Sequence, residues 1–388
     1  MILDFRFWIL DCRNPKPKIQ NPKSGRRGRT ELACALVAFV AFQLAANFAA
    51  DFIEPGLREP EYGRKLALLK TQLRQLPQRP LLLLLGSSRT AYGVRPDRLF
   101  DAATAETPLV YNFGILGGGP LYELLYFQRL LAAGIRPRWV VIEVHPALLK
   151  TAPELMGAHI PPIERCDARD LWLLRDYLDA PLASGRDWLG YRAAACYRLR
   201  GELLRRVMPH WLPAPAVSDT SALDQTTPSG WVPGAWPRPD AAMRQARAKL
   251  VRQIYAPGYR DFEVSDRPNR ALRQILALCR QEGIVAALLL MPEAEELRDA
   301  EVTLAQQRIS RYLWELGREY DAQVFDASHW CNDADFADGQ HLLADAAERL
   351  SVKLGQDALR GWLASSDSRP AAPSTVPGLA AGRRHEVR

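Results

Sequence analysis

Several common signatures are missing from this sequence, and each absence removes a class of protein. The six cysteines include no Cys-x-x-Cys pair or other metal-binding spacing, so we expect no metal site. No Gly-x-Ser-x-Gly segment is present, which argues against the nucleophile turn of the α/β-hydrolases. Neither a Gly-x-Gly-x-x-Gly pattern nor a P-loop lysine accompanies the glycines at 117–119, and we therefore expect no cofactor.

An excess of positive charge is confined to the two ends of the chain. The net charge is +7, but residues 1–30 contribute +6 and residues 365–388 contribute +2, which leaves −1 for everything between them. This balance gives no support to a nucleic-acid-binding face, and we expect no nucleic-acid partner.

Residues 31–53 are predicted to form a transmembrane anchor. Leu32 to Ala50 is a 19-residue run that only Gln43 and Asn47 interrupt, close to the roughly 20 residues that cross a bilayer as a helix. Basic residues precede the run and acidic residues follow it, which predicts a cytoplasmic segment 1–30 and a domain on the periplasmic or extracellular side. A cleaved signal peptide is the competing interpretation, although no Ala-x-Ala site ends the run. A buried helix of a soluble protein is the third.

This topology limits what the cysteines can do. Cys12 is expected in the cytoplasm and Cys34 in the membrane, so four cysteines remain for the exported domain. One or two disulfides can form among them, but their pairing cannot be deduced from the sequence.

Residues 81–364 alternate between short apolar runs and helical patterns, which predicts an α/β domain with a doubly wound, mostly parallel five-stranded sheet. The expected strands are 81–85, 109–112, 139–144, 284–290 and 323–325. The main helices between and after them are expected at 96–103, 121–133, 270–281, 304–320 and 342–354.

Three further segments lie outside this alternation. Residues 54–80 are polar and contain several prolines, so we predict a stalk with a helical stretch at 65–76. Residues 148–260 are predicted to be an insertion over the carboxyl edge of the sheet, with helices at 170–178 and 191–207 followed by a loop rich in Pro and Trp. Residues 365–388 have the composition of a disordered tail.

Chemically useful residues follow the predicted strands, where parallel sheets place their ligand sites. Gly86-Ser87-Ser88 comes after the first strand, Asn112 to Gly117 after the second, and Glu143 to Pro146 after the third. Asp338-x-x-His341 comes after the last strand. A serine activated by a histidine that a carboxylate orients is the arrangement of a nucleophilic catalyst.

With these blocks the chain resembles the SGNH, or GDSL-type, hydrolases and acyltransferases, whose fold is flavodoxin-like. The resemblance implies that Ser88 is the nucleophile, His341 the base and Asp338 the triad acid, with Gly117 donating its N–H to the oxyanion. Ser87 replaces the usual Asp of the Gly-Asp-Ser block. The Asn of the third block is missing, and His145 stands where it is expected. His145 is either a substitute oxyanion donor or a structural histidine at the strand end.

The chain is also similar to the membrane-tethered members that transfer acyl groups to cell-envelope polymers. We therefore expect an anchored serine esterase or O-acyltransferase acting on an ester of an envelope carbohydrate or polymer, with the bilayer and envelope proteins as partners. Water as acceptor gives an esterase and a sugar hydroxyl gives a transferase, and the residues do not separate these outcomes. The alternative is a catalytically degenerate SGNH-like module that binds polymer or scaffolds an envelope complex.

Overall fold

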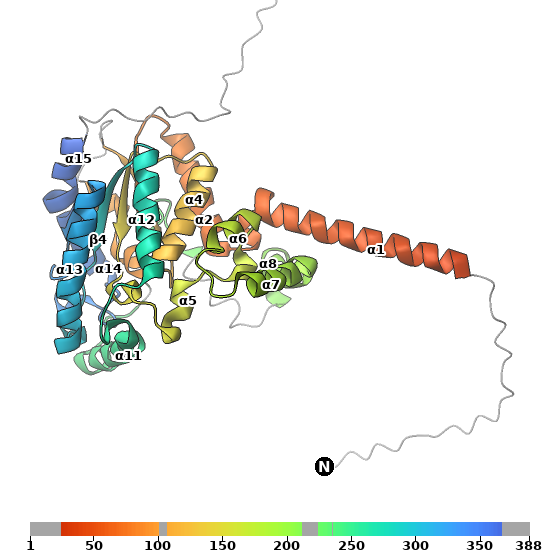
Figure 1. Ribbon diagram of the computed structural model, residues 1–388. Coiled ribbons are helices and arrows are strands. Elements are labelled where there is room, and N and C mark those ends of the chain that lie inside the picture. The colour runs from red at the N-terminus through yellow and green to blue at the C-terminus, as the bar shows by residue number, and fades with distance from the viewer. Residues whose placement is uncertain (1–24, 101–106, 212–223, 235, 367–388) are drawn as a thin grey trace, which may run out of the picture.

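A parallel β-sheet forms the centre of the domain, flanked on both faces by helices (Figure 1). The computed structural model describes residues 25–100, 107–211, 224–234 and 236–366. The sheet order is β2-β1-β3-β4-β5, and every neighbouring pair is parallel. The strands are β1 Leu81–Gly86, β2 Leu109–Gly114, β3 Trp139–Glu143, β4 Val285–Leu290 and β5 Gln323–Asp326.

The predicted α/β class and five strands are confirmed, and the sheet is wholly parallel. Both faces of β1 are buried: Leu81, Leu83 and Leu85 pack into one core cluster, whereas Leu82 and Leu84 pack into the other. Each fully buried leucine contributes about 1.5–3 kcal/mol. A strand covered on both faces needs apolar residues at every position, which explains the uninterrupted leucine run.

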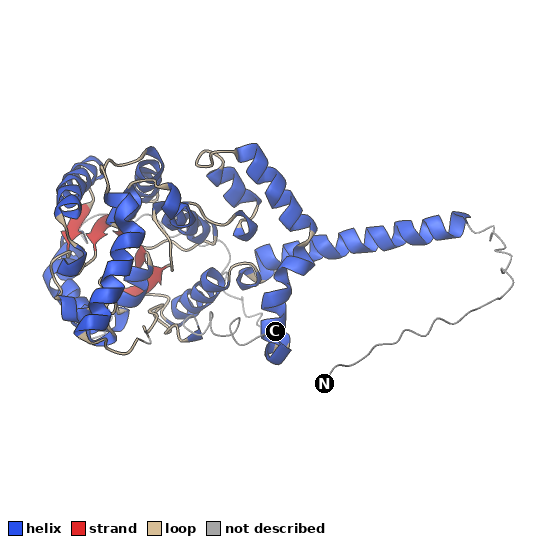
Figure 2. Cartoon of the chain, turned by 90° about the horizontal axis from the view of Figure 1, so that it is seen from below, coloured by secondary structure: helices blue, strands red, loops and turns tan. Residues whose placement is uncertain are grey.

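The helices divide between the two core clusters, and the sheet lies between them when the molecule is seen from below (Figure 2). One face is covered by α2 Pro60–Gln75, α4 Pro120–Ala132, α12 Asp266–Gln281 and α13 Ala300–Tyr320. The other is covered by α3 Ser88–Gly93, α14 Ala344–Lys353 and α15 Arg360–Ser366. Helix α11 Ala241–Tyr259 lies across the lower end of the sheet in Figure 1, against the turns that follow β3 and β4. A π-helical turn, Leu354–Leu359, joins α14 to α15.

The insertion is mostly helical, as predicted, but its second helix is divided. In place of a single helix over 191–207 the chain forms α7 Pro181–Ala193 and α8 Ala195–Val207. Ala194, between them, leaves helical geometry at φ −113° and ψ 32°. The other helices of the insertion are α5 Met156–His159, α6 Ala168–Leu174 and α11, which the sequence pattern did not predict. Short 3-10 turns span Pro146–Leu149, Pro153–Leu155, Ile163–Arg165 and Pro209–Trp211.

Two other predicted helices need correction, and two predicted segments lie mostly outside the described residues. The segment 96–103 forms only a 3-10 turn, Pro96–Arg98, before residues that lie outside the described part. The last predicted helix begins at Ala344 rather than at 342, because Leu342 pairs with Phe336 in an antiparallel bridge. Most of the basic segment 1–30 and of the tail 365–388 lies outside the described residues.

The segment 54–80 is not a free stalk. After a 3-10 turn, Pro55–Leu57, helix α2 packs its buried Tyr62, Leu66 and Leu69 into the core beneath the sheet. Its apolar residues recur at three- and four-residue spacing, so one face of the helix is buried and the polar face remains toward solvent. The domain therefore starts about 20 residues before β1.

Helix α1 Gly25–Phe48 projects away from the domain (Figure 1) and continues through a π-helical turn, Ala49–Ile53. Residues Gly28–Ile53 form a 26-residue helical stretch that contains an 18-residue window with a mean hydropathy of 2.0, so it is long and apolar enough to span a membrane. Its large apolar side chains are exposed, for example Val37 and Phe42. Exposed apolar side chains over this length are costly in water and favourable in lipid.

Candidate active site

The turn that follows β1 presents Ser88 at the carboxyl end of a central strand. Ser87 caps the short helix α3, and its Oγ accepts a hydrogen bond from the N–H of Arg89 at 3.1 Å. Ser88 is the first residue of α3 and is half-buried. A Cβ added at Gly86 would lie 2.3 Å from Thr90 Oγ1 and 2.6 Å from Glu143 Oε2, so only glycine fits before the turn.

Ser88, His341 and Asp338 form a continuous hydrogen-bonded chain. Ser88 Oγ lies 2.8 Å from His341 Nε2, although 253 residues separate them in the sequence. His341 Nδ1 lies 2.7 Å from Asp338 Oδ2. With the proton on Nδ1, His341 donates to Asp338 and leaves Nε2 free to accept the Ser88 proton, which is the arrangement that activates a serine.

Asp338 is held as a carboxylate by the backbone around it. Its Oδ1 accepts hydrogen bonds from the N–H groups of His341 at 2.9 Å and Gln340 at 3.1 Å. Burial acts to raise the pKa of Asp338, but the hydrogen bonds and charge of His341 and the Gln340 N–H outweigh it and lower the pKa. The Asp338 carboxyl group is therefore ionised throughout the neutral pH range.

A tight turn brings the acid and the base together. The Phe336–Leu342 bridge closes this turn, and Ala337 N–H donates to His341 O at 2.8 Å. Gly339 adopts φ +96°, which a side chain would make costly, and its carbonyl accepts from Ala294 N–H at 2.9 Å. The three-residue spacing of Asp338 and His341 is therefore set by a tight turn, which the Phe336–Leu342 bridge and the Gly339 hydrogen bond hold in place.

Two aromatic rings border His341. Tyr92 of α3 lies edge-on at 5.6 Å between ring centroids, and Trp236 lies at 5.4 Å. Trp236 comes from the predicted insertion and also contacts Tyr92 at 4.6 Å. Trp231 donates its indole N–H to Tyr92 O at 2.7 Å. The insertion therefore forms part of the wall of the site.

Glu143, at the end of β3, organises the nucleophile turn. Its carboxylate accepts hydrogen bonds from Ser87 N at 2.8 Å, Ser87 Oγ at 2.9 Å and Thr90 Oγ1 at 2.6 Å. Thr90 N also donates to it, at 3.2 Å. The side chain is fully buried. Sequence reasoning missed this role, although a carboxylate that ends an otherwise apolar strand was a usable signal.

Arg89 ties the same turn to the end of β4. The buried guanidinium donates to Glu293 Oε1 at 2.9 Å and to Met291 O at 2.7 Å, and its Nε lies 3.8 Å from Glu143 Oε1. Burial opposes the charge of Arg89, but Glu293 and Glu143 outweigh this effect and raise its pKa. Arg89 is paired with core carboxylates, so it is not available to an anionic substrate.

We expect Glu143→Gln to lower both stability and turnover. An amide cannot accept from all these donors without turning its NH₂ toward one of them, and Arg89 loses a charge partner, at a cost of about 2 kcal/mol. Displacing Ser88 is expected to lower kcat about 10- to 100-fold. Urea unfolding and p-nitrophenyl acetate kinetics on the full chain in detergent measure the two effects. The control Glu319→Gln removes an exposed ion pair with Arg273 and should change neither. Unchanged values for Glu143→Gln would contradict the role.

Of the two predicted oxyanion residues, Gly117 lies on the loop after β2, beside the nucleophile turn. The Gly114–Gly86 register and the hydrogen bond from Ile115 N–H to Gly86 O at 2.8 Å align this loop with the end of β1. Gly117 itself is exposed and adopts φ +73°. This left-handed conformation favours glycine.

Helix α2 supports the Gly117 loop. Leu116 N–H donates to Glu61 Oε1 at 3.0 Å, and Lys65 Nζ donates to Asn112 O at 3.2 Å and Gly230 O at 2.8 Å. Burial raises the pKa of Glu61 to about 7 and lowers that of Lys65 to about 8, while each opposes the shift of the other. The segment predicted as a stalk thus positions a loop of the site.

His145 is buried and stacks on Tyr255 of α11 at 4.9 Å. Neither ring nitrogen has a hydrogen-bond partner among the described residues. Burial, followed by the charge of Arg89, lowers the pKa of His145 well below its ordinary value, while the Gln340 side chain acts in the opposite direction. His145 is therefore a neutral imidazole, and Gln340 is the polar side chain next to its ring. Its role as an oxyanion donor stays a prediction.

No group of three or more His, Cys, Asp or Glu side chains suited to a metal ion occurs in the described part of the chain. Cys34, Cys166, Cys196, Cys279 and Cys331 are all free thiols. Burial raises the pKa of Cys331 to about 12, and it raises the pKa of Cys166 and Cys279 as well. The thiols of Cys166, Cys279 and Cys331 are therefore protonated and unreactive at neutral pH.

Comparison with known proteins does not assign the chain. No family model matches the sequence, and no curated protein matches it.

Proposed function

We propose that this protein is a membrane-anchored serine esterase or O-acyltransferase of the SGNH type. The single observation that carries the proposal is the Ser88–His341–Asp338 chain of hydrogen bonds at the carboxyl edge of the sheet. A structural cap or turn needs no imidazole on the serine hydroxyl and no carboxylate behind that imidazole. The three groups together match the requirements of nucleophilic catalysis.

In the proposed reaction Ser88 Oγ bonds to the carbonyl carbon of an acyl ester while its proton moves to His341 Nε2. Asp338 stabilises the resulting imidazolium. The tetrahedral adduct then collapses, its bond to the alcohol oxygen breaks, and His341 returns the proton to that oxygen. Water or a sugar hydroxyl then bonds to the acyl carbon and gives its proton to His341 Nε2. The bond between that carbon and Ser88 Oγ breaks as His341 returns the proton to Oγ, which restores Ser88 and releases the carboxylic acid or the new ester.

The oxyanion of the adduct is assigned to the N–H groups of Ser88 and Gly117, with His145 as a third donor. Loss of one such donor typically lowers turnover by about 10²–10³. The missing Asn of the third block therefore makes His145 the residue on which full activity depends. A neutral imidazole carries one N–H, which is the donor that this task requires.

Two features support the SGNH type beyond the triad. The strand order β2-β1-β3-β4-β5 is that of flavodoxin-like sheets, in which the site lies where the chain reverses direction beside the first strand. The Gly-Ser-Ser, Asn-Phe-Gly-Ile-Leu-Gly and Asp-x-x-His blocks follow β1, β2 and β5 in that order. The combination is more specific than any one block.

The substrate class follows from the anchor and the wall of the site. A retained α1, with basic residues before it and acidic residues after it, favours a domain on the periplasmic or extracellular side. Esters of envelope carbohydrates or polymers are the acyl compounds available there. Trp236 and Tyr92 beside His341 are suited to contact a sugar ring.

The second candidate is a degenerate SGNH-like module that binds polymer or scaffolds an envelope complex. The observation that favours it is the block-three replacement, since His145 is buried against Tyr255 rather than hydrogen-bonded to the turn that carries Ser88. The two candidates differ in whether Ser88 is nucleophilic.

A fluorophosphonate probe separates them, because its phosphorus is attacked by an activated serine and fluoride leaves. We expect one labelled peptide, the one that contains Ser88, in the full-length protein, and no label in His341→Ala. Labelling of a different serine, or none in the wild type, would remove the enzyme proposal and favour the binding module.

A further inference from the structure

The hairpin formed by α7 and α8 is attached to the outer half of α1. The two polar residues that interrupt the apolar run, Gln43 and Asn47, both bond to it. Gln43 Oε1 accepts from Cys196 N–H at 3.1 Å, and Asn47 Nδ2 donates to Arg192 O at 2.8 Å. The hairpin therefore satisfies both polar groups that would otherwise be costly in lipid.

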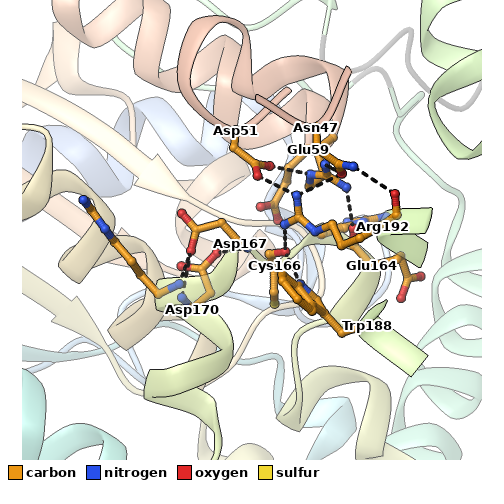
Figure 3. A network of polar contacts seen from close by, with 12 residues as sticks. Asn47, Asp51, Glu59, Glu164, Cys166, Asp167, Asp170, Trp188 and Arg192 are labelled. Atoms are coloured by element: carbon orange, nitrogen blue, oxygen red, sulfur yellow. Dashed lines mark hydrogen bonds and ion pairs between the residues drawn. The ribbon is translucent and has the colours of Figure 1, made fainter. Parts of the chain in front are cut away.

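A network of charged groups holds the hairpin against the end of α1 (Figure 3). Asp51 accepts hydrogen bonds from Arg58 Nε at 2.8 Å and from Arg192, and Asn47 Oδ1 accepts from Arg58 at 3.0 Å. Trp188 Nε1 donates to Cys166 O at 3.0 Å. The side chains of Arg58 and Arg192 are only 6% and 10% exposed. Paired charges with so little exposure define a fixed joint between helix and hairpin.

The position of this joint along α1 places the hairpin at the level of the lipid. At 1.5 Å per residue, a hydrocarbon core of about 30 Å that begins at Arg29 ends near residue 49. Gln43 is then about 9 Å inside the outer boundary, counted as six residues of helix rise. Interfacial helices bury their apolar face by about 5–10 Å, which matches this depth.

The free surface of the hairpin has the composition of an interfacial helix pair. In α7, Leu182 is 88% exposed, and Leu189, one heptad later on the same face, is 60% exposed. In α8, Tyr197 is 60% exposed and Val207 is 71% exposed. The exposed Trp211 follows α8. In water each of these side chains leaves apolar area unburied, whereas a bilayer covers it.

Arginines accompany these aromatic residues. Arg198 stacks over Tyr191 at 4.5 Å, and Arg200 stacks over Tyr197 at 3.6 Å. Tyrosine and tryptophan concentrate at the headgroup level of membranes, and arginine reaches from apolar surface toward phosphate. Tyrosine, tryptophan and arginine are also enriched at protein interfaces, so it is the depth of the hairpin along α1 that favours a phospholipid surface.

We propose that the α7–α8 hairpin docks into the outer lipid interface of the same bilayer that α1 crosses. The proposal rests on α1 crossing the bilayer, and it does not depend on the chemistry assigned to Ser88. The anchor and the hairpin together form a two-point attachment, which holds the domain in one orientation above the membrane.

Photo-crosslinking in the full chain tests the proposal. The residue p-benzoylphenylalanine is placed at 189 or 197, and the protein is reconstituted in vesicles of phosphatidylethanolamine and phosphatidylglycerol that carry radioactive phospholipid. Leu304 of α13 is the matched control, since it is 61% exposed and α13 lies on the opposite side of the domain from α1 (Figure 1). Phe42 of α1, 63% exposed, reports insertion of the anchor.

We expect positions 42, 189 and 197 to acquire phospholipid label, with at least about tenfold more at 189 than at 304. Label at 42 with none at 189 and 197 would overturn the docking while leaving the anchor in place. No label at 42 would overturn both. The irradiation is then repeated in native membranes. A crosslink from position 189 to a protein in place of lipid would also overturn the proposal.

Discussion

The kcat for hydrolysis of p-nitrophenyl acetate is expected to be about 10⁶-fold lower in Ser88→Ala than in the wild type. Removal of a triad nucleophile eliminates the covalent route. Only water attack aided by the oxyanion donors then remains. Ser88 Oγ lies 2.8 Å from His341 Nε2, so no other hydroxyl can take over without moving the turn. Initial rates of the detergent-solubilised full chain, purified in parallel for both proteins, measure the loss.

The control for this experiment is Ser310→Ala, which removes an exposed hydroxyl from α13. It should keep the wild-type rate, and far-ultraviolet circular dichroism should show the same helix content in all three proteins. Equal rates for Ser88→Ala and the wild type would remove the enzyme proposal for simple acyl esters, and the binding-module interpretation would then take its place.

Asp338→Asn is expected to lower kcat by about 10⁴-fold with little change in KM. The amide keeps the shape of the side chain but can present its NH₂ to His341 Nδ1, which then holds the wrong tautomer and no longer accepts the Ser88 proton at Nε2. The imidazolium also loses its charge partner. Steady-state kinetics with p-nitrophenyl acetate separate kcat from KM.

The effect of Asp338→Asn should also show a defined dependence on pH. Because the folded pKa of Asp338 is lowered, the stability that its ionised form contributes is present above its unfolded pKa of about 3.9. It is lost as the pH falls through the lower folded value. The difference in unfolding free energy between the wild type and Asp338→Asn, measured by urea unfolding, should therefore shrink as the pH falls below about 4.

Asp266→Asn is the matched control, since it removes an exposed ion pair with Arg270 within α12. Because exposed pairs contribute little, this variant should keep wild-type kinetics. A wild-type kcat in Asp338→Asn would show that His341 needs no oriented carboxylate and would exclude the triad mechanism.

The sheet could be predicted because its strands carry a local signal. Every residue is apolar in Leu81 to Leu85, and in Trp139 to Glu143 only Glu143 is polar. A sheet that is covered on both faces requires this pattern. The helical faces of α4 and α12 repeat at three and four residues. Such patterns are properties of neighbouring residues, so no tertiary information was needed to find them.

The position of α2 could not be predicted in the same way. Its residues are amphipathic and rich in charge, which equally suits a solvated stalk and a helix with one buried face. Only packing against the sheet decides between them, and the buried Lys65 satisfies its charge by donating to the backbone at Asn112 and Gly230, far along the chain. The division of 181–207 into two helices likewise follows from the contacts of Arg192 and Cys196 with α1.

By itself the sequence determined the strands, the apolar span of α1 and the residue types capable of acyl chemistry, since each depends on composition and short-range spacing. Only the tertiary structure decided that Ser88 meets His341 across 253 residues, and that Glu143 of a neighbouring strand holds the nucleophile turn. It also decided that the hairpin bonds to Gln43 and Asn47. Contacts of this kind depend on how separate elements are placed in space, and no local pattern encodes a partner hundreds of residues away.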